Sequence, residues 1–245
     1  MLMYFSGVGG KEERAILREA GATHVLADIF DYAGIADWPG KKILDSGEYA
    51  RFKSRDLPLD QRKVLPSIPD YMAFGEACGC EWYLQQNVIA NPRATWANWE
   101  LMQHGPKCLP VFQWGSDRAL LQGILDTCGD RPIAIGGLVM KMRDHDEEML
   151  GELLDLCQAY PGRFHVLGLA WTKALEAVRW LVRSADSSMF MTGGRHAMLV
   201  MENNSARLIA LHYRHIPEAA SWTRRERCVK NAQALQAYCN QGATL

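Results

Sequence analysis

The chain has 245 residues, of which 48% are hydrophobic, and a formal net charge of -1 at pH 7. Such a chain can bury a substantial core, and one barrel or one open α/β sheet would use all of it, so we expect a single domain over residues 1–245. The near-neutral charge argues against a nucleic-acid binder that works through overall charge alone. No run of about 18 apolar residues and no signal-peptide pattern occurs, so we expect a soluble, cytoplasmic protein that does not contact a membrane.

Short apolar runs that end in glycine or a polar residue alternate with segments of helical periodicity. The runs predict strands at residues 2–5, 24–27, 42–44, 87–90, 109–113, 133–135, 165–169 and 188–191. Apolar residues at helical spacing predict helices at residues 12–20, 71–80, 95–104, 118–127, 147–160 and 172–182. Strands that alternate with helices pair in parallel, so the pattern predicts a (β/α)8 TIM-type barrel with a degenerate unit between its second and third strands. A doubly wound open sheet is the alternative architecture.

Two parts of the chain depart from this alternation. Residues 46–69 are polar and contain three prolines, which is more typical of a mobile lid or binding loop than of a structured element. After residue 193, strands at 197–201 and 208–211 predict a hairpin, followed by a helix at about 222–239. We expect this C-terminal extension, from about residue 195 to 245, to extend the barrel or to cover one of its ends.

The sequence gives no sign of a metal or a cofactor. Seven cysteines is an odd number, and without a secretory signal they are typical of reduced core residues rather than of disulfides. Cys78 and Cys80 form the only close pair, and they lack the partners that a zinc site needs. The glycines before Lys11 lack the spacing and the following Ser or Thr of a phosphate-binding loop, so we discard a nucleoside triphosphate as ligand.

Two aspartates stand at predicted strand ends far apart in the sequence. Asp45 follows the apolar run 42–44 and precedes Ser46 and Gly47, whereas Asp186 lies in a serine-rich segment. Active sites of barrels are built at the carboxyl ends of the strands, so the two carboxylates can meet at one mouth. The alternative for Asp45 is a helix N-cap or an Asx turn, and for Asp186 a turn fixed by local hydrogen bonds.

Three further strands carry candidate residues for a flat ligand. Gly136 and Gly137 offer backbone N–H groups to a planar ligand or an anion, or they form a simple tight turn. Gln113 and Trp114 combine a hydrogen-bonding amide with an indole for stacking, although Trp114 fits a core position equally well. His165 begins a strand, where a lone histidine is more often structural than catalytic.

Basic residues gather in two segments. The first contains Arg51, Lys53, Arg55, Arg62 and Lys63, and the second contains Arg224, Arg225, Arg227 and Lys230. Either segment can form a local basic patch, although an ordinary solvated surface is the more common explanation for each taken alone.

Six motifs occur in an order that resembles the tRNA-guanine transglycosylase superfamily. They are Ile43-Leu-Asp-Ser-Gly47, the segment from Asn91 to Met102, Pro110-Val-Phe-Gln-Trp-Gly115, Ala134-Ile-Gly-Gly137, His165-Val-Leu-Gly168 and Ser184-Ala-Asp-Ser-Ser188. They are most similar to the short, often phage-borne branch that inserts 7-deazaguanines into DNA. The resemblance covers about residues 40–190 and rests on the order of the motifs rather than on any one of them.

The resemblance implies a (β/α)8 barrel that exchanges guanine in DNA, or alternatively in tRNA, for a 7-deazaguanine such as preQ0 without ATP. Asp186 would attack C1′ of the target nucleotide and form a covalent intermediate, while Asp45 would act as general acid/base and contact the base. By the same analogy the base would be bound by Ser46, Gly47, Asn87, Gln113, Trp114, Gly136, Gly137 and His165. Asn87 stands where the DNA-modifying branch often has an aspartate, and the zinc site of the larger relatives has no counterpart here.

The expected substrate is an unpaired or flipped nucleotide, because the target base must leave its stack. Phosphate contacts would come from Arg51, Lys53, Arg55, Arg224 and Arg225, or from an accessory DNA-modification protein. Two other functions fit the same residues. A hydrolase of N-glycosidic or glycosidic bonds would use Asp45 and Asp186 with water, and a barrel without catalysis would bind only a purine or a nucleic acid.

Overall fold

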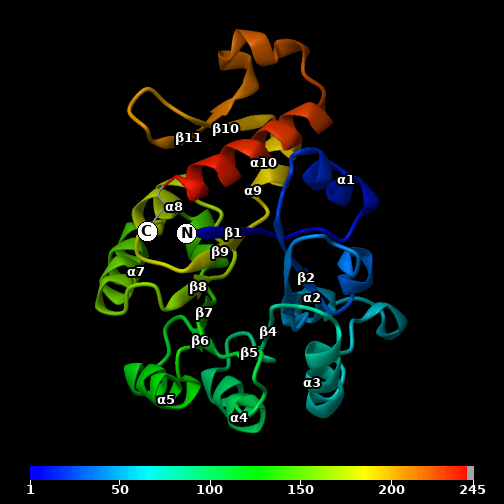
Figure 1. Ribbon diagram of the computed structural model, residues 1–245, viewed down its shortest axis with the longest axis vertical. Helices are drawn as coiled ribbons and strands as arrows, with labels where there is room; N and C mark the ends of the chain where they lie inside the picture. The colour runs from blue at the N-terminus through cyan, green and yellow to red at the C-terminus, as the bar shows by residue number, and fades with distance from the viewer. Residues whose placement is uncertain (242–245) are drawn as a thin grey trace.

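The computed structural model describes residues 1–241, apart from the side chains at positions 140, 192 and 193, and shows a barrel of parallel strands surrounded by helices (Figure 1). Its strand segments are β1 (Leu2–Phe5), β2 (His24–Asp28), β3 (Lys41–Asp45), β4 (Trp82–Leu84), β5 (Cys108–Leu109), β6 (Val111–Gln113), β7 (Ile133–Gly136), β8 (Phe164–Val166) and β9 (Ser184–Ser187). They pair in the order β5-β4-β3-β2-β1-β9-β8-β7-β6, with every pair parallel.

The sheet closes at a proline. Only Pro110 separates β5 from β6, so residues 108–113 form one interrupted strand, which pairs with β4 before the proline and with β7 after it. Gln85 bridges the interruption, because its backbone N donates a hydrogen bond to Leu109 O (2.8 Å) and its side-chain Oε1 accepts one from Val111 N (2.8 Å). Its Nε2 donates to Thr95 O (2.5 Å), which fixes the orientation of the side chain. The two ends of the sheet therefore meet, which confirms the predicted (β/α)8-type barrel and excludes the open sheet.

Helices follow most of the strands and cover the outside of the barrel (Figure 1). They are α1 (Lys11–Glu19), α2 (Glu48–Ser54), α3 (Ile68–Ala77), α4 (Pro92–Met102), α5 (Arg118–Cys128), α6 (Val139–Arg143), α7 (Glu147–Ala159), α8 (Thr172–Val178), α9 (Met189–Arg195) and α10 (Arg224–Asn240). Short 3-10 helices are η1 (Tyr32–Ile35), η2 (Leu59–Gln61), η3 (Tyr213–His215) and η4 (Pro217–Ser221). Side chains of Asn91, Asp117 and Asp146 cap α4, α5 and α7. The link between β2 and β3 holds η1 in place of an α-helix, which confirms the degenerate unit predicted there.

Alternation along the strands separates an inner core from an outer one. Residues such as Tyr4 and Ile43 fill the barrel, while their neighbours, for example Leu44, pack outward against the helices. Asp45 lies two residues after Ile43 and shares its inward face. Asp186 is the register partner of Tyr4 across β9 and β1, so it faces inward as well. Burial of the apolar partners thus fixes the direction of both carboxylates.

The fourth strand is Trp82–Leu84, so the prediction of a strand at residues 87–90 is wrong. Residues 87–90 form a loop in which Thr95 Oγ1 accepts a hydrogen bond from Val88 N (2.9 Å) and donates one to Val88 O (3.2 Å). The adjacent apolar residues Val88 and Ile89 look like the apolar run of a strand. The backbone of Val88 is nevertheless hydrogen-bonded by a side chain and not by a neighbouring strand.

The last barrel strand is Ser184–Ser187, and the predicted strand at 188–191 instead runs into the first turn of α9. Inward positions of this strand carry Ser184 and Asp186 rather than apolar residues, so the hydrophobic pattern of a strand is missing from it.

The prediction of an unstructured loop at residues 46–69 is also wrong, because this segment contains α2 and η2. The buried carboxylate of Glu48 accepts hydrogen bonds from Arg51 and from Ile89 N, which ties α2 to the loop after β4. Ser54 Oγ accepts a further bond from Lys63 N (2.9 Å). Buried polar contacts of this kind leave no periodic signal in a sequence.

The C-terminal extension forms the predicted hairpin and helix. Strands β10 (Met198–Glu202) and β11 (Leu208–His212) make a separate antiparallel sheet, so the hairpin does not extend the barrel. The long helix α10 contacts β10 on one side and α1 and α9 on the other (Figure 1). Buried Asn231 accepts from Val200 N and donates to Met198 O, which fixes the hairpin on α10. No helix within residues 1–241 is long and apolar enough to cross a membrane.

Candidate active site

The carboxyl ends of the strands bring three carboxylates to one mouth. Asp28 and Asp45 are register partners at the ends of β2 and β3, and Asp186 lies on β9, which is separated from β2 only by β1. The negative charges of Asp186 and Asp28 both raise the pKa of Asp45, so both carboxylates lie close enough to act on Asp45. The structure therefore brings together the two aspartates that the sequence singled out.

Asp45 is the proton-exchanging candidate of the mouth. Burial, followed by the charges of Asp186 and Asp28, raises its pKa to about 6, against the opposing effect of hydrogen bonds from the N–H groups of Gly47 and Ser46. A carboxyl with such a pKa exists in both protonation states near neutral pH, as general acid/base catalysis requires. The bond from Gly47 N forms an Asx-type turn, whereas α2 has no side-chain cap, so Asp45 is not a helix N-cap.

Asp186 is held in a fixed orientation. Its Oδ1 accepts a hydrogen bond from Gly168 N (2.9 Å), and its backbone oxygen accepts one from Leu169 N (2.8 Å). Only 4% of the residue is exposed. No hydrogen bond from any described residue reaches Oδ2, so this oxygen is available to a reacting atom.

His165 lies behind Asp186 inside the barrel. Its Nδ1 is 2.8 Å from Ser184 Oγ, and its Nε2 is 3.6 Å from Asp186 Oδ1, beyond hydrogen-bond distance. The edge of Tyr4 packs against the ring, with the two centroids 5.7 Å apart. Because the side chain is completely buried, its position favours support of Asp186 over the predicted contact with a base.

Ser46, Gly47 and Asn87 surround Asp45. The buried hydroxyl of Ser46 lies 3.3 Å from Asp45 Oδ1 and 3.4 Å from Asn87 Oδ1, so the loop after β4 meets the end of β3 here. Gly47 has a φ of +82°, and a Cβ at this position would approach Phe30 Cε2 to 2.7 Å. Glycine is therefore required by both the backbone conformation and the available space.

The ends of β6 and β7 form a second wall. Gln113 and Gly136 are register partners, and Trp114 N donates to Gly136 O (2.8 Å). A Cβ on Gly136 would lie 3.2 Å from Val111 Cγ1, and Gly137 has a φ of +85°. Gln113 is buried and its amide bonds to none of the described residues, which leaves it free for a ligand. Trp114 is half-buried and packs against the outer core, so its indole has a structural role.

The basic candidates differ in how far their charge is compensated. Arg51 donates to Glu48 Oε1 (2.7 Å), and Arg225 donates to Glu19 Oε2 (2.7 Å), so a carboxylate neutralises each of them. Lys53, Arg55 and Arg224 are exposed. Arg51 and Lys53 lie on α2, which begins three residues after Asp45, and Arg55 follows that helix, whereas Arg224 and Arg225 lie on α10 in the C-terminal extension.

Sequence reasoning missed Asp28 as a site residue. It ends an apolar strand just as Asp45 does, so the same pattern would have found it. Its Oδ1 accepts from Phe30 N and Asp31 N, both at 3.0 Å. Burial, followed by the charge of Asp31, raises its pKa. It thus contributes a third acidic group that makes ionisation of Asp45 more difficult.

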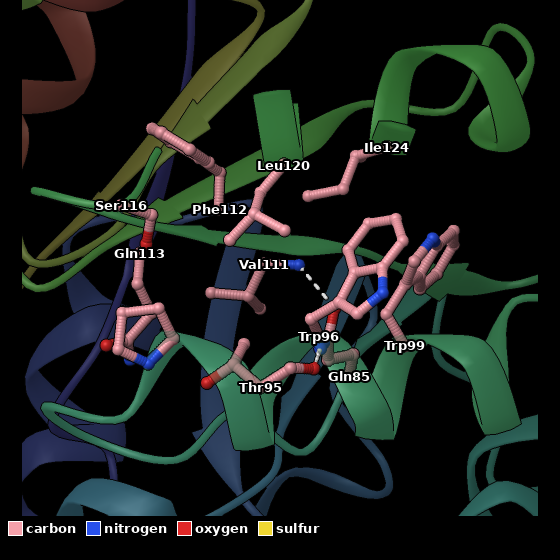
Figure 2. Close-up of a pocket in the computed structure, with 11 residues that line it drawn as sticks. Gln85, Thr95, Trp96, Trp99, Val111, Phe112, Gln113, Ser116, Leu120 and Ile124 are labelled. Carbon is pink, nitrogen blue, oxygen red and sulfur yellow. Dashed lines mark hydrogen bonds between the residues drawn. The ribbon is translucent and has the colours of Figure 1, made fainter. Parts of the chain in front are cut away.

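Two hollows lie between α4 and α5, beside the carboxylates rather than between them. The inner one, drawn in Figure 2, has a volume of ≈ 10 Å³ and is lined by Gln85, Thr95 and Gln113 among others. The outer one is an open groove of ≈ 490 Å³ along Arg93, Trp96 and Ser116. Of the predicted site residues, only Gln113 lines either of them.

No three His, Cys, Asp or Glu side chains within residues 1–241 are arranged to hold a metal ion. No protein-family model matches the chain, and no curated protein is significantly similar to it in sequence.

Proposed function

We propose that this protein is a base-exchange transglycosylase that replaces guanine in DNA with a 7-deazaguanine such as preQ0. The observation that carries the proposal is the pairing of Asp186 with Asp45, whose pKa is raised to about 6, in one barrel mouth. One carboxylate can act as nucleophile while the other exchanges a proton with the base. The ordered motifs that resemble the tRNA-guanine transglycosylase superfamily support the same chemistry, because five of the six lie on or beside strand ends.

In the first displacement, an Asp186 oxygen bonds to C1′ of the target nucleotide as the bond from C1′ to the guanine nitrogen breaks. The electron pair of that bond stays on the guanine, and protonated Asp45 supplies the proton that neutralises it. Gly168 N holds Asp186 Oδ1, which leaves Oδ2 for the attack. The product is a glycosyl ester of Asp186 and a free base.

In the second displacement, the corresponding nitrogen of the 7-deazaguanine attacks C1′ and the ester bond to Asp186 breaks. The incoming base loses its proton to the Asp45 carboxylate, which restores the starting state. Two displacements retain the configuration at C1′. Asp45 must donate and accept a proton in each cycle, and a pKa of about 6 suits both tasks near neutral pH.

Base recognition in this proposal falls to the groups around the two carboxylates. The free amide of Gln113 offers a donor and an acceptor to the edge of a heterocycle. Gly136 and Gly137 carry no side chain, so a flat ring can approach their backbone closely. Asn87 and Ser46 lie on the other side, next to Asp45.

The test is incorporation of labelled preQ0 into double-stranded DNA, single-stranded DNA and tRNA, each offered separately to the purified protein. Label in DNA that disappears in Asp186→Asn supports the proposal, and label in tRNA alone changes the polymer. Release of guanine without incorporation would identify a hydrolase, in which water replaces the second base. Absence of both reactions, with and without an extract that supplies accessory proteins, would refute base exchange.

A further inference from the structure

We propose that residues 48–64, comprising α2 and η2, form a binding platform for an unpaired nucleic-acid strand beside the mouth. The inference rests on the proposed function, since a base-exchange enzyme must hold the polymer on either side of its target nucleotide. It adds a surface and a binding mode to that function. We call this segment the α2 platform.

The α2 platform is fastened to the mouth at several points. It begins three residues after Asp45, and Glu48 accepts a hydrogen bond from Ile89 N (3.3 Å) in the loop after β4. Just beyond its end, Pro66 O accepts a bond from Gln86 Nε2 (3.1 Å). Because both ends are tied to the loop after β4, the surface between them has a defined position relative to Asp45.

Large apolar side chains are unusually exposed on the α2 platform. Four of the nine exposed large hydrophobic residues in the described part of the chain lie here, namely Tyr49, Leu57, Leu59 and Val64. Tyr49 is 51% exposed and Leu59 80% exposed. The other five are spread over the rest of the described chain, so this concentration marks residues 48–64 as the candidate binding segment.

Cations of the platform lie over aromatic rings. Lys53 Nζ is 5.3 Å from the centre of the Tyr49 ring, and Arg55 Cζ is 4.0 Å from that of Phe52. Lys63 Nζ lies 4.9 Å from the ring of Phe30, at the end of β2. The rings hold the positive groups at the surface, where they remain accessible to an anion.

The charge of the platform is positive and only partly compensated. It holds five basic and three acidic residues, and Glu48 already neutralises Arg51. Lys53 and Arg62 have no carboxylate within ion-pair distance among the described residues. Lys63 lies close enough to Asp28 for its charge to oppose the rise in the pKa of that carboxyl, and Arg55 meets the exposed carboxylate of Asp56 at 3.4 Å. The platform therefore carries an excess of positive charge while the whole chain is close to neutral.

Alternating rings and cations fit an unpaired strand better than a duplex. Cations bind phosphates in either form, but Tyr49 can stack only on a base whose face is exposed. A duplex buries its base faces and would leave Tyr49, Leu57 and Leu59 without a partner. The chemistry of the surface thus selects a single strand, which enters the mouth with its bases already free.

Binding is measured by fluorescence anisotropy with a labelled mixed-sequence deoxyoligonucleotide of about 16 nucleotides, alone and annealed to its complement. In Lys53→Glu/Arg55→Glu, the slope of log affinity against log salt for the single strand should fall by about 1.4, at about 0.7 per phosphate contact. Tyr49→Ala should weaken single-strand binding by about fivefold or more and leave that slope unchanged. Arg183→Glu is the matched control for each single reversal, Lys53→Glu and Arg55→Glu, because it makes the same charge change just before β9, at the opposite end of that strand from Asp186.

Tighter binding of the single strand than of the duplex, lost in the platform variants and kept in the control, is the expected result. Equal affinities for the two forms, or unchanged binding in both variants, would overturn the inference. Incorporation of preQ0 is measured on the same proteins. Platform-dependent binding without incorporation would reject the proposed exchange and leave the platform standing, whereas incorporation with binding unaffected by the variants would reject the platform alone.

Discussion

Replacement of Asp45 by asparagine should raise the stability of the fold at neutral pH and abolish most of the exchange activity. Burial and the neighbouring charges raise the pKa of Asp45 from 3.8 to about 6, so the folded state opposes ionisation of this carboxyl. At about 1.4 kcal/mol per pKa unit, the ionised carboxylate destabilises the fold by about 3 kcal/mol at pH 7. Asp45→Asn removes this penalty together with the proton that the proposed exchange needs.

The sign of the pH dependence follows from the direction of the pKa change. Below the pKa that Asp45 has in the unfolded state, the carboxyl is protonated in both states and does not affect stability. As the pH rises from that pKa to and through the higher pKa of the folded state, the free energy of unfolding falls. Between about pH 4 and pH 7, the free energy of unfolding of the wild type should therefore fall by about 2.4 kcal/mol relative to that of Asp45→Asn. Any packing or hydrogen-bonding defect of the asparagine is the same at both pH values and cancels in this difference.

The assay is urea unfolding of wild type and Asp45→Asn at pH 4 and pH 7, with preQ0 incorporation measured on the same samples. The stability of Asp45→Asn minus that of wild type should be larger at pH 7 than at pH 4. The rate of exchange by the variant should be lower by orders of magnitude. Asp155→Asn, an exposed carboxyl on α7, is the control and should show the same difference from wild type at both pH values. A stability difference for Asp45→Asn that does not change with pH would refute the pKa argument, and normal exchange would refute its catalytic role.

Three other substitutions test the mouth. Asp186→Asn should abolish exchange and leave oligonucleotide affinity within about twofold of wild type, measured by anisotropy; normal turnover would remove the nucleophile from the mechanism. Asp28→Asn removes a charge that raises the pKa of Asp45, so the midpoint of the pH–rate profile should move to lower pH, and an unmoved midpoint would contradict the coupling. Gly47→Ala places a Cβ 2.7 Å from Phe30 at a φ of +82°, and chemical unfolding should show a loss of about 1–3 kcal/mol; wild-type stability would show that the turn is adaptable.

The sequence predicted those elements whose residues follow a simple period. Strands such as β1 and β3 are apolar runs closed by polar residues, and helices such as α4 and α5 begin with side-chain caps and carry an apolar face. Asp45 could be placed at a strand end because it closes an apolar run and is followed by Ser46 and Gly47, whereas the strand predicted beside Asp186, at residues 188–191, does not form in the structure. These signals are local, so a single sequence is sufficient to read them.

The missed elements depend on contacts between distant residues. β9 carries Ser184 and Asp186 on its inward face, because polar groups are needed there, and it therefore lacks the apolar alternation of a strand. The helix α2 is fixed by the buried Glu48, whose partner Ile89 lies 41 residues away. Asp28 was overlooked although its pattern matches that of Asp45, since no motif of the resemblance included it.

At the interruption beside Pro110, the side chain of Gln85 supplies a hydrogen-bond acceptor that a neighbouring strand would otherwise supply. Gln85 bonds Val111 N where a regular ladder would supply a backbone carbonyl, and Val111 lies two residues before Gln113 in the wall of the mouth. The two halves of the barrel are therefore joined here by this side-chain bond together with the backbone bonds from Gln85 N to Leu109 O and from Ala134 N to Pro110 O. Exchange of Gln85 would therefore move the wall that carries Gln113 without changing any residue of a strand.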